Sequence, residues 1–128
     1  MDGGTSREGG GARLTEEEVR RRPHGRLAQA KVASNYVDSN VAKWRAEQDG
    51  CQDGIILDHT GLNVAEFSVS NIICLFDDTI VSPHPSSGAL NGITKQTIHT
   101  VAYELYGLPT TDQSIPVRRV SDARLIIY

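Results

Sequence analysis

Cysteine, aromatic residues and long apolar runs are all scarce in this chain. Its 128 residues include only Cys51 and Cys74, too few for a disulfide framework and not spaced as a CxxC pair. We therefore expect two reduced thiols. No apolar run approaches the roughly 18 residues that a membrane-spanning helix needs, and the N-terminus lacks the apolar core of a signal peptide. These absences predict no membrane association and a cytoplasmic location.

An excess of positive charge is also missing. The formal net charge is −3, so the composition does not favour a nucleic-acid-binding surface. No histidine is spaced from another histidine or a cysteine as metal ligands are, so we expect no metal site; the four histidines are His24, His59, His84 and His99. The length and a mean hydropathy of −0.33 fit one ordinary globular domain.

Apolar periodicity predicts two helices. Val37, Val41 and Trp44 recur at i, i+4 and i+7 within residues 35–48, with Ala42 beside them, and Gly50 fits a C-cap. The second helix should open at residues 92–94 and end at Gly107, just before Pro109; its helical spacing is carried by Ile98, Val101, Ala102 and Leu105.

A β-rich region separates the two helices. Strands are expected at residues 54–57, 62–67, 71–76 and 79–81. Their near-continuous apolar runs are typical of strands covered on both faces. Residues 111–128 should form one extended segment that ends in an apolar strand, 125–127.

The N-terminal part carries weaker signals. Residues 1–20 are rich in glycine and charge, and we expect a flexible tail there, followed by a domain over 21–128. Residues 14–22 fit either a helix with a Thr15–Glu18 capping box or an extended lead-in to Pro23.

Three features could carry chemistry, and each has a simpler explanation. Lys31 lies among small and apolar residues, where desolvation would make its amine a nucleophile, although it could equally be a solvated surface lysine. Glu66, late in its strand, could bind a ligand or could be an exposed strand-end carboxylate. Residues 91–94 begin a helix, which is a natural anion site but also fits simple N-capping.

The order of several motifs resembles one enzyme family. Lys31 is followed five residues later by Tyr36 in an Asn-Tyr pair, then by a helix. Residues 54–61 (GIILDHTG), 64–66 (VAE), 70–72 (SNI) and 88–95 (GALNGITK) then follow in sequence. Together these motifs, between Arg21 and Gly107, resemble the class IV, fold-type IV aminotransferases of the branched-chain and D-amino-acid type. The resemblance also favours an extended segment before Pro23.

This resemblance implies a fold and a cofactor. The fold would be α/β, with the mixed, barrel-like sheet of the fold-type IV large domain. Residues 21–128 would be part of that cofactor-binding domain. Pyridoxal 5'-phosphate would be held by Lys31 as a Schiff base, with Lys31 also moving protons during catalysis. Tyr36 would bond the phenolic oxygen and Glu66 would face the pyridine nitrogen. Ile93 and Thr94 would form the phosphate cup.

The resemblance also implies an activity with alternatives. The expected reaction moves an amino group between an amino acid, for example a branched-chain one, and a 2-oxo acid, in a homodimer. An aminodeoxychorismate-lyase-like enzyme is one alternative. Another is a truncated, non-catalytic remnant that binds the cofactor weakly or pairs with a full-length homologue, because the family's small N-terminal domain and later Gly-Thr segment have no counterpart here. Phe67 and Val69 are bulkier than the residues usual at these positions and would reshape the pocket.

Overall fold

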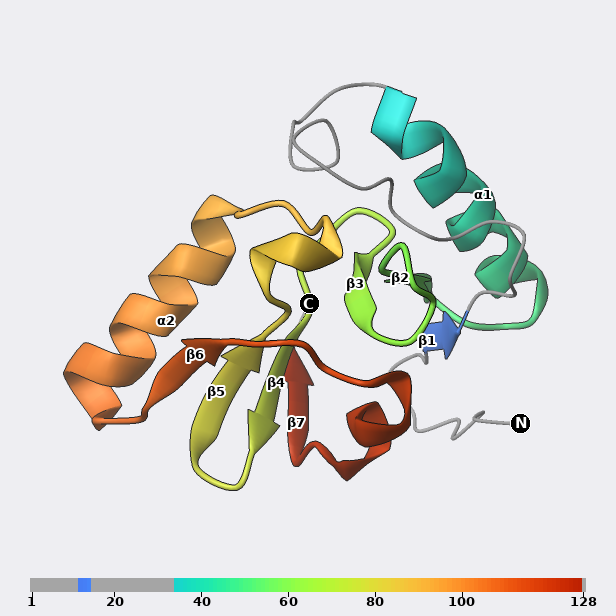
Figure 1. The fold of residues 1–128 in the computed structure, drawn as a ribbon. Helices are drawn as coiled ribbons and strands as arrows, with labels where there is room; N and C mark the ends of the chain where they lie inside the picture. Colours follow the sequence, from blue (N-terminus) through green and yellow to red (C-terminus); the bar gives the residue numbers. More distant parts are fainter. Residues whose placement is uncertain (1–11, 15–33, 128) are drawn as a thin grey trace.

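In this computed structural model, residues 12–14 and 34–127 are described (Figure 1). They form a mixed arrangement of helices and two sheets, as the α/β expectation requires. None of the helices in this described part is long and apolar enough to cross a membrane. Lys31 lies outside the described residues, as does most of the segment for which helix and extended chain were both open.

The first helix, α1 (Ser34–Gln48), forms where periodicity predicts it and ends beside Gly50, whose φ is +76°. Of the predicted apolar positions, Ala42 is buried but the large side chains are not. Val37 and Trp44 are 63% and 59% exposed. The helix instead packs through a row of small residues, which let its backbone approach strand β2 closely: Ser39, Ala42 and Ala46.

A three-stranded sheet lies under α1. Strand β1 (Ala12–Leu14) pairs in parallel with β2 (Asp53–Leu57), which pairs antiparallel with β3 (Val64–Phe67). The expected tail over residues 1–20 therefore contributes one short strand to the sheet. All four residues of β3 are buried, so the strand is covered on both faces as its apolar run indicates.

The second sheet has four strands in the order β6-β5-β4-β7. Strands β4 (Ile73–Phe76) and β5 (Thr79–Ser82) form a hairpin, and β7 (Leu125–Ile127) pairs antiparallel with β4. The helix α2 (Ile93–Tyr106) connects β5 to β6 (Thr110–Asp112), which lies parallel to β5. This β-α-β unit places the start of α2 on the loop that leaves the end of β5 (Figure 1).

Alternating side chains of the four-stranded sheet divide the apolar core. Ile73 and Ile80 pack under Ala102 of α2, whereas Cys74 and Val81 face the other way. That second face meets side chains of the three-stranded sheet and of the segment after β6. The shared core contains Ile55, Val64, Phe67, Ile72, Cys74, Phe76, Val81, Ile115 and Val120. The two helices consequently cover opposite sides of the paired sheets (Figure 1).

The prediction of one extended segment over residues 111–128 is wrong. Strand β6 begins at Thr110, and a 3-10 helix, Val117–Asp122, interrupts the chain before β7. This turn carries Val120 into the core and stacks the Arg119 guanidinium over Phe76, 4.4 Å from the ring centre. A straight strand could not bury Val120 in this way, and this explains why a 3-10 helix replaces the extended chain.

Candidate functional site

The predicted site residues divide by what the structure describes. Lys31 lies outside the described residues, and for Tyr36 the structure describes only its place in the first turn of α1. Glu66, Ile93 and Thr94 are described with their surroundings. Strand β3 and helix α2 set the positions of these three residues.

Glu66 lies within β3 and is 4% exposed, so it is not an exposed strand-end carboxylate. Its Oε2 atom accepts a hydrogen bond from the backbone N–H of Leu90 at 3.2 Å. A buried carboxylate is costly unless it is hydrogen-bonded or meets a positive group. Its position beside the loop before α2 is therefore a candidate for ligand binding.

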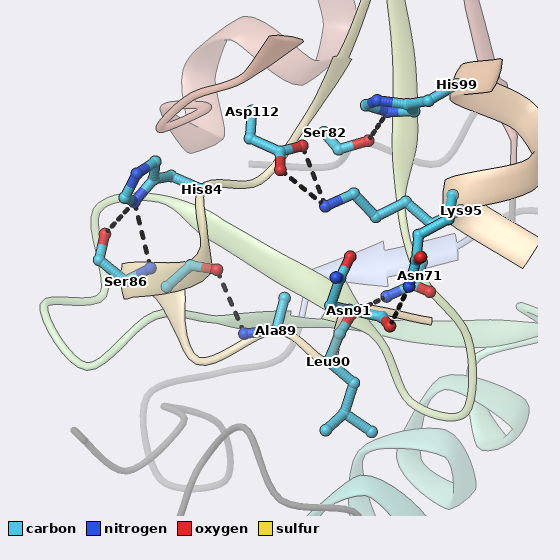
Figure 2. A network of polar contacts seen from close by, with 12 residues as sticks. Asn71, Ser82, His84, Ser86, Ala89, Leu90, Asn91, Lys95, His99 and Asp112 are labelled. Carbon is cyan, nitrogen blue, oxygen red and sulfur yellow. Dashed lines mark hydrogen bonds and ion pairs between the residues drawn. The ribbon is translucent and has the colours of Figure 1, made fainter. Parts of the chain in front are cut away.

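The loop between β5 and α2 is held by polar contacts on both sides of Leu90, and Figure 2 shows the one from Asn71. While the N–H of Leu90 donates to Glu66, its carbonyl accepts a hydrogen bond from Nδ2 of Asn71 at 2.6 Å. Earlier in the loop, Gly88 adopts φ +83° and the hydroxyl of Ser87 accepts from the N–H of Ala89 at 3.3 Å. These bonds fix the path by which the chain reaches the helix.

Simple side-chain capping does not describe the start of α2. Gly92 is the N-cap and makes no side-chain capping bond, while Ile93 is 83% exposed and Thr94 is also exposed. A Cβ atom on Gly92 would clash with Oδ1 of Asn71, so the close approach needs glycine. The first backbone N–H groups of the helix and the Thr94 hydroxyl are thus accessible to an anion.

A buried hydroxyl belongs to the residue that directly precedes Asn71. Oγ of Ser70 is buried with no hydrogen-bond partner among the described residues. Ser70 closes the turn after β3, where its carbonyl accepts from the N–H of Phe67 at 2.9 Å. A buried donor without a partner is unusual and indicates a group that the described residues do not supply.

The described groups fit pyridoxal phosphate. The buried Glu66 carboxylate suits a protonated ring nitrogen, and the accessible N–H groups at Ile93 and Thr94 suit a phosphate. Leu90 connects the two, since it bonds Glu66 and lies three residues before Ile93. Of the two bulky residues that were expected to reshape the pocket, Phe67 packs in the shared core, whereas the Val69 side chain is exposed.

Sequence reasoning missed a second set of polar contacts on α2 and the neighbouring strands. Lys95 forms an ion pair with Asp112, and Nε2 of His99 lies 2.7 Å from Oγ of Ser82 (Figure 2). Lys95 and His99 are four residues apart, so their spacing places them on one face of a helix. Their partners could not be found from that spacing, since each lies 17 residues away in the chain.

Known proteins resemble this chain in sequence. A family model described as "Amino-transferase class IV" matches residues 6–127. Branched-chain-amino-acid aminotransferase 1, mitochondrial, from Arabidopsis thaliana is 35% identical over 109 residues, which cover 84% of this chain and 28% of that protein. This chain spans about a third of the length of the curated relatives it matches.

Solved structures show the same fold. The branched-chain amino acid aminotransferase of Escherichia coli superposes with a TM-score of 0.83 at 28% identity, over 92% of this chain and 38% of that one. The branched-chain aminotransferase of Thermoproteus uzoniensis, solved with norvaline, gives a TM-score of 0.82 at 29% identity, over 93% of this chain and 39% of that one. These neighbours carry the fold-type IV arrangement of which this chain forms a part.

Proposed function

The chain belongs to the class IV amino-transferase family, and from that premise we propose that it forms the cofactor-binding part of a pyridoxal-phosphate-dependent transaminase. The observation that carries the proposal is the link through Leu90 between the buried Glu66 carboxylate and the accessible start of α2. A site with a carboxylate at one end and free helix N–H groups at the other matches a cofactor with a basic ring nitrogen and a phosphate.

Each proposed site residue has a distinct task. Bound pyridoxal phosphate supplies an electron sink for the bond changes at the substrate Cα. Lys31 attaches the cofactor covalently, and its Nζ accepts and returns the proton that moves. Tyr36 donates a hydrogen bond to the phenolic oxygen. Glu66 keeps the ring nitrogen protonated, because a neighbouring negative charge stabilises the positive form.

Phosphate binding is assigned to the first turn of α2. The backbone N–H groups of Ile93 and Thr94 and the Thr94 hydroxyl hold the phosphate, with the positive end of the helix dipole adding to the attraction. The reaction we propose transfers an amino group from an amino acid, preferably a branched-chain one, to a 2-oxo acid. The names of the relatives favour this reaction over a lyase acting on aminodeoxychorismate.

The oligomeric state of the protein and its location in the cell are also proposals. We expect a homodimer, which sedimentation of the purified chain would test directly. A cytoplasmic location stays a prediction from the sequence. The Arabidopsis relative, by contrast, is named as a mitochondrial protein.

Attachment of the cofactor to Lys31 provides the primary test. Purified protein is incubated with pyridoxal phosphate, reduced with borohydride, digested and mapped by mass spectrometry. We expect a pyridoxyl adduct on Lys31 that disappears in Lys31→Ala and persists in the control Lys43→Ala, which alters a half-buried lysine of α1. An adduct at another lysine, or none, would refute the assignment. Adduct formation with no turnover of leucine and 2-oxoglutarate would instead support the non-catalytic remnant.

A further inference from the structure

Lys95 has an unusual environment for a lysine on a helix surface. It is 6% exposed and directly follows Thr94, yet its ammonium turns away toward β6 (Figure 2). There its Nζ lies 3.0 Å from each carboxylate oxygen of Asp112. Lysine is almost never buried unless it is paired, so this ion pair decides where the side chain lies.

Other contacts at the start of α2 are weak. Ile93, Thr94, Gln96 and Thr97 are exposed, and the side chains of Gln96 and Thr97 donate hydrogen bonds to nearby backbone carbonyls. Apolar packing of the helix begins only with its second turn, at the positions Ile98 and Ala102. Among the described residues, the ion pair is thus the side-chain contact that joins the first turn of α2 to a strand.

A second polar contact follows one helical turn later. Nε2 of His99 lies 2.7 Å from Oγ of Ser82 at the end of β5. Ser82 and Asp112 are register partners on the parallel strands β5 and β6. The ends of two neighbouring strands therefore contact two successive turns on one face of α2. These contacts fix the position of α2 along its axis and its rotation about that axis.

From this arrangement we infer that Lys95, through its ion pair with Asp112, is a positioning residue for the phosphate group of the cofactor. The inference rests on the proposed function, because the phosphate is assigned to Ile93 and Thr94. Hydrogen bonds from backbone N–H groups lose strength steeply with distance and angle, so a displaced first turn holds a phosphate poorly. The pairing also neutralises the Asp112 carboxylate, which would otherwise repel an anion at the helix start.

A first experiment tests the anchoring without any cofactor. Amide hydrogen exchange is measured for residues 96–99, whose N–H groups bond within the first turns, in the wild-type chain and in Lys95→Met. We expect exchange about tenfold faster in this stretch and unchanged in residues 101–106. Lys95→Arg should restore slow exchange, since arginine keeps the charge. Unchanged exchange at residues 96–99 would overturn the inference.

The matched control is an exposed ion pair at the turn between β4 and β5. Arg124 and Asp78 lie 3.5 Å apart, with side chains 66% and 86% exposed. Arg124→Met removes one charge, as Lys95→Met does, but should leave exchange at residues 96–99 unaltered. A similar acceleration in both variants would show a general loss of stability and would overturn the specific role of Lys95.

A second experiment connects the anchor to the phosphate. Dissociation constants are measured for pyridoxal phosphate and for pyridoxal, which lacks the phosphate. In Lys95→Met we expect the preference for the phosphorylated compound to fall about tenfold, with pyridoxal affinity unchanged. Asp112→Asn breaks the same ion pair but removes the carboxylate that would repel the phosphate, so it should lower this preference less. Equal weakening of both compounds would overturn the inference and leave the proposed function intact. Wild-type protein that does not prefer pyridoxal phosphate would instead refute the phosphate site itself, while the exchange experiment still decides the anchoring.

Discussion

Glu66 combines burial with a hydrogen bond to the loop before α2. Its side chain accepts from the N–H of Leu90, and replacing it with glutamine keeps an acceptor oxygen of the same reach. The negative charge is lost, and the second carboxylate oxygen becomes an NH2 group that donates instead of accepting. The structural and the electronic contributions of this residue can therefore be separated by substitution.

We expect Glu66→Gln to retain cofactor attachment at Lys31 but to lower kcat/KM for transamination by about 100-fold. The reason is that a neutral amide no longer keeps the ring nitrogen protonated. Steady-state kinetics with leucine and 2-oxoglutarate would measure the loss. Glu66→Asp is the complementary variant, because it keeps the charge and shortens the reach to Leu90. Full activity in Glu66→Gln would contradict the assigned role.

At this scale the sequence singles out candidate residues but does not identify the side chains they contact. Glu66, Ile93 and Thr94 could be singled out because the motifs around them resemble a known family. The bond between Asn71 and Leu90 joins residues 19 apart, and the Lys95–Asp112 pair joins residues 17 apart. Such pairs depend on how β4, β5 and β6 align, which local spacing does not specify.

At the scale of elements, α2 depends on glycine at both ends for different reasons. Gly92 has an ordinary φ of −66° but leaves no room for a Cβ beside Asn71. Gly107 has φ +64° with open space around it, and its N–H closes the C-terminus of the helix on Tyr103 at 3.0 Å. The first constraint is steric, while the second is conformational.

The two glycines should consequently respond differently to alanine. Gly107→Ala should lower the free energy of unfolding by about 1 kcal/mol and leave cofactor affinity unchanged. Gly92→Ala should weaken pyridoxal phosphate binding about tenfold or more, because Asn71 must move away from the carbonyl of Leu90. Thermal unfolding and cofactor titration of both variants would measure this. Equal affinities in the two variants would show that the Gly92–Asn71 approach does not shape the site.

Periodicity located both helices and the central strands but not every buried face. Glycines and prolines mark where α1 and α2 end, and these signals act locally. Val37 and Trp44 have the spacing of a core-facing stripe, yet the small face of α1 meets β2. The face that packs depends on the close approach that alanine allows, and this is a property of the partner surface as much as of the helix.

At the scale of the whole molecule, two titrating groups tie the fold to pH. Burial lowers the pKa of His99, an effect that the nearby Lys95 charge strengthens and Asp112 opposes. For Asp58, burial acts to raise the pKa, but hydrogen bonds from Thr60 and Asn63 together outweigh it and leave the pKa lowered from 3.8. Both groups therefore bind protons more weakly in the folded chain than in the unfolded one.

The sign of the stability change follows from linkage. Where the unfolded chain binds more protons than the folded chain, the free energy of unfolding rises with pH. Acidification below the ordinary pKa of each group therefore lowers the free energy of unfolding. For His99 the loss begins as pH falls below 6.5, the ordinary value, and for Asp58 it begins below 3.8.

We expect urea unfolding across pH 3 to 8 to show both losses. His99→Gln should remove the first and Asp58→Asn the second, each with lower stability at pH 8. Since His99 bonds Ser82 on the face of α2 that carries Lys95, protonation of its ring should loosen the same helix that we propose holds the phosphate. A pH profile unchanged in His99→Gln would show that this contact does not couple the fold to acid.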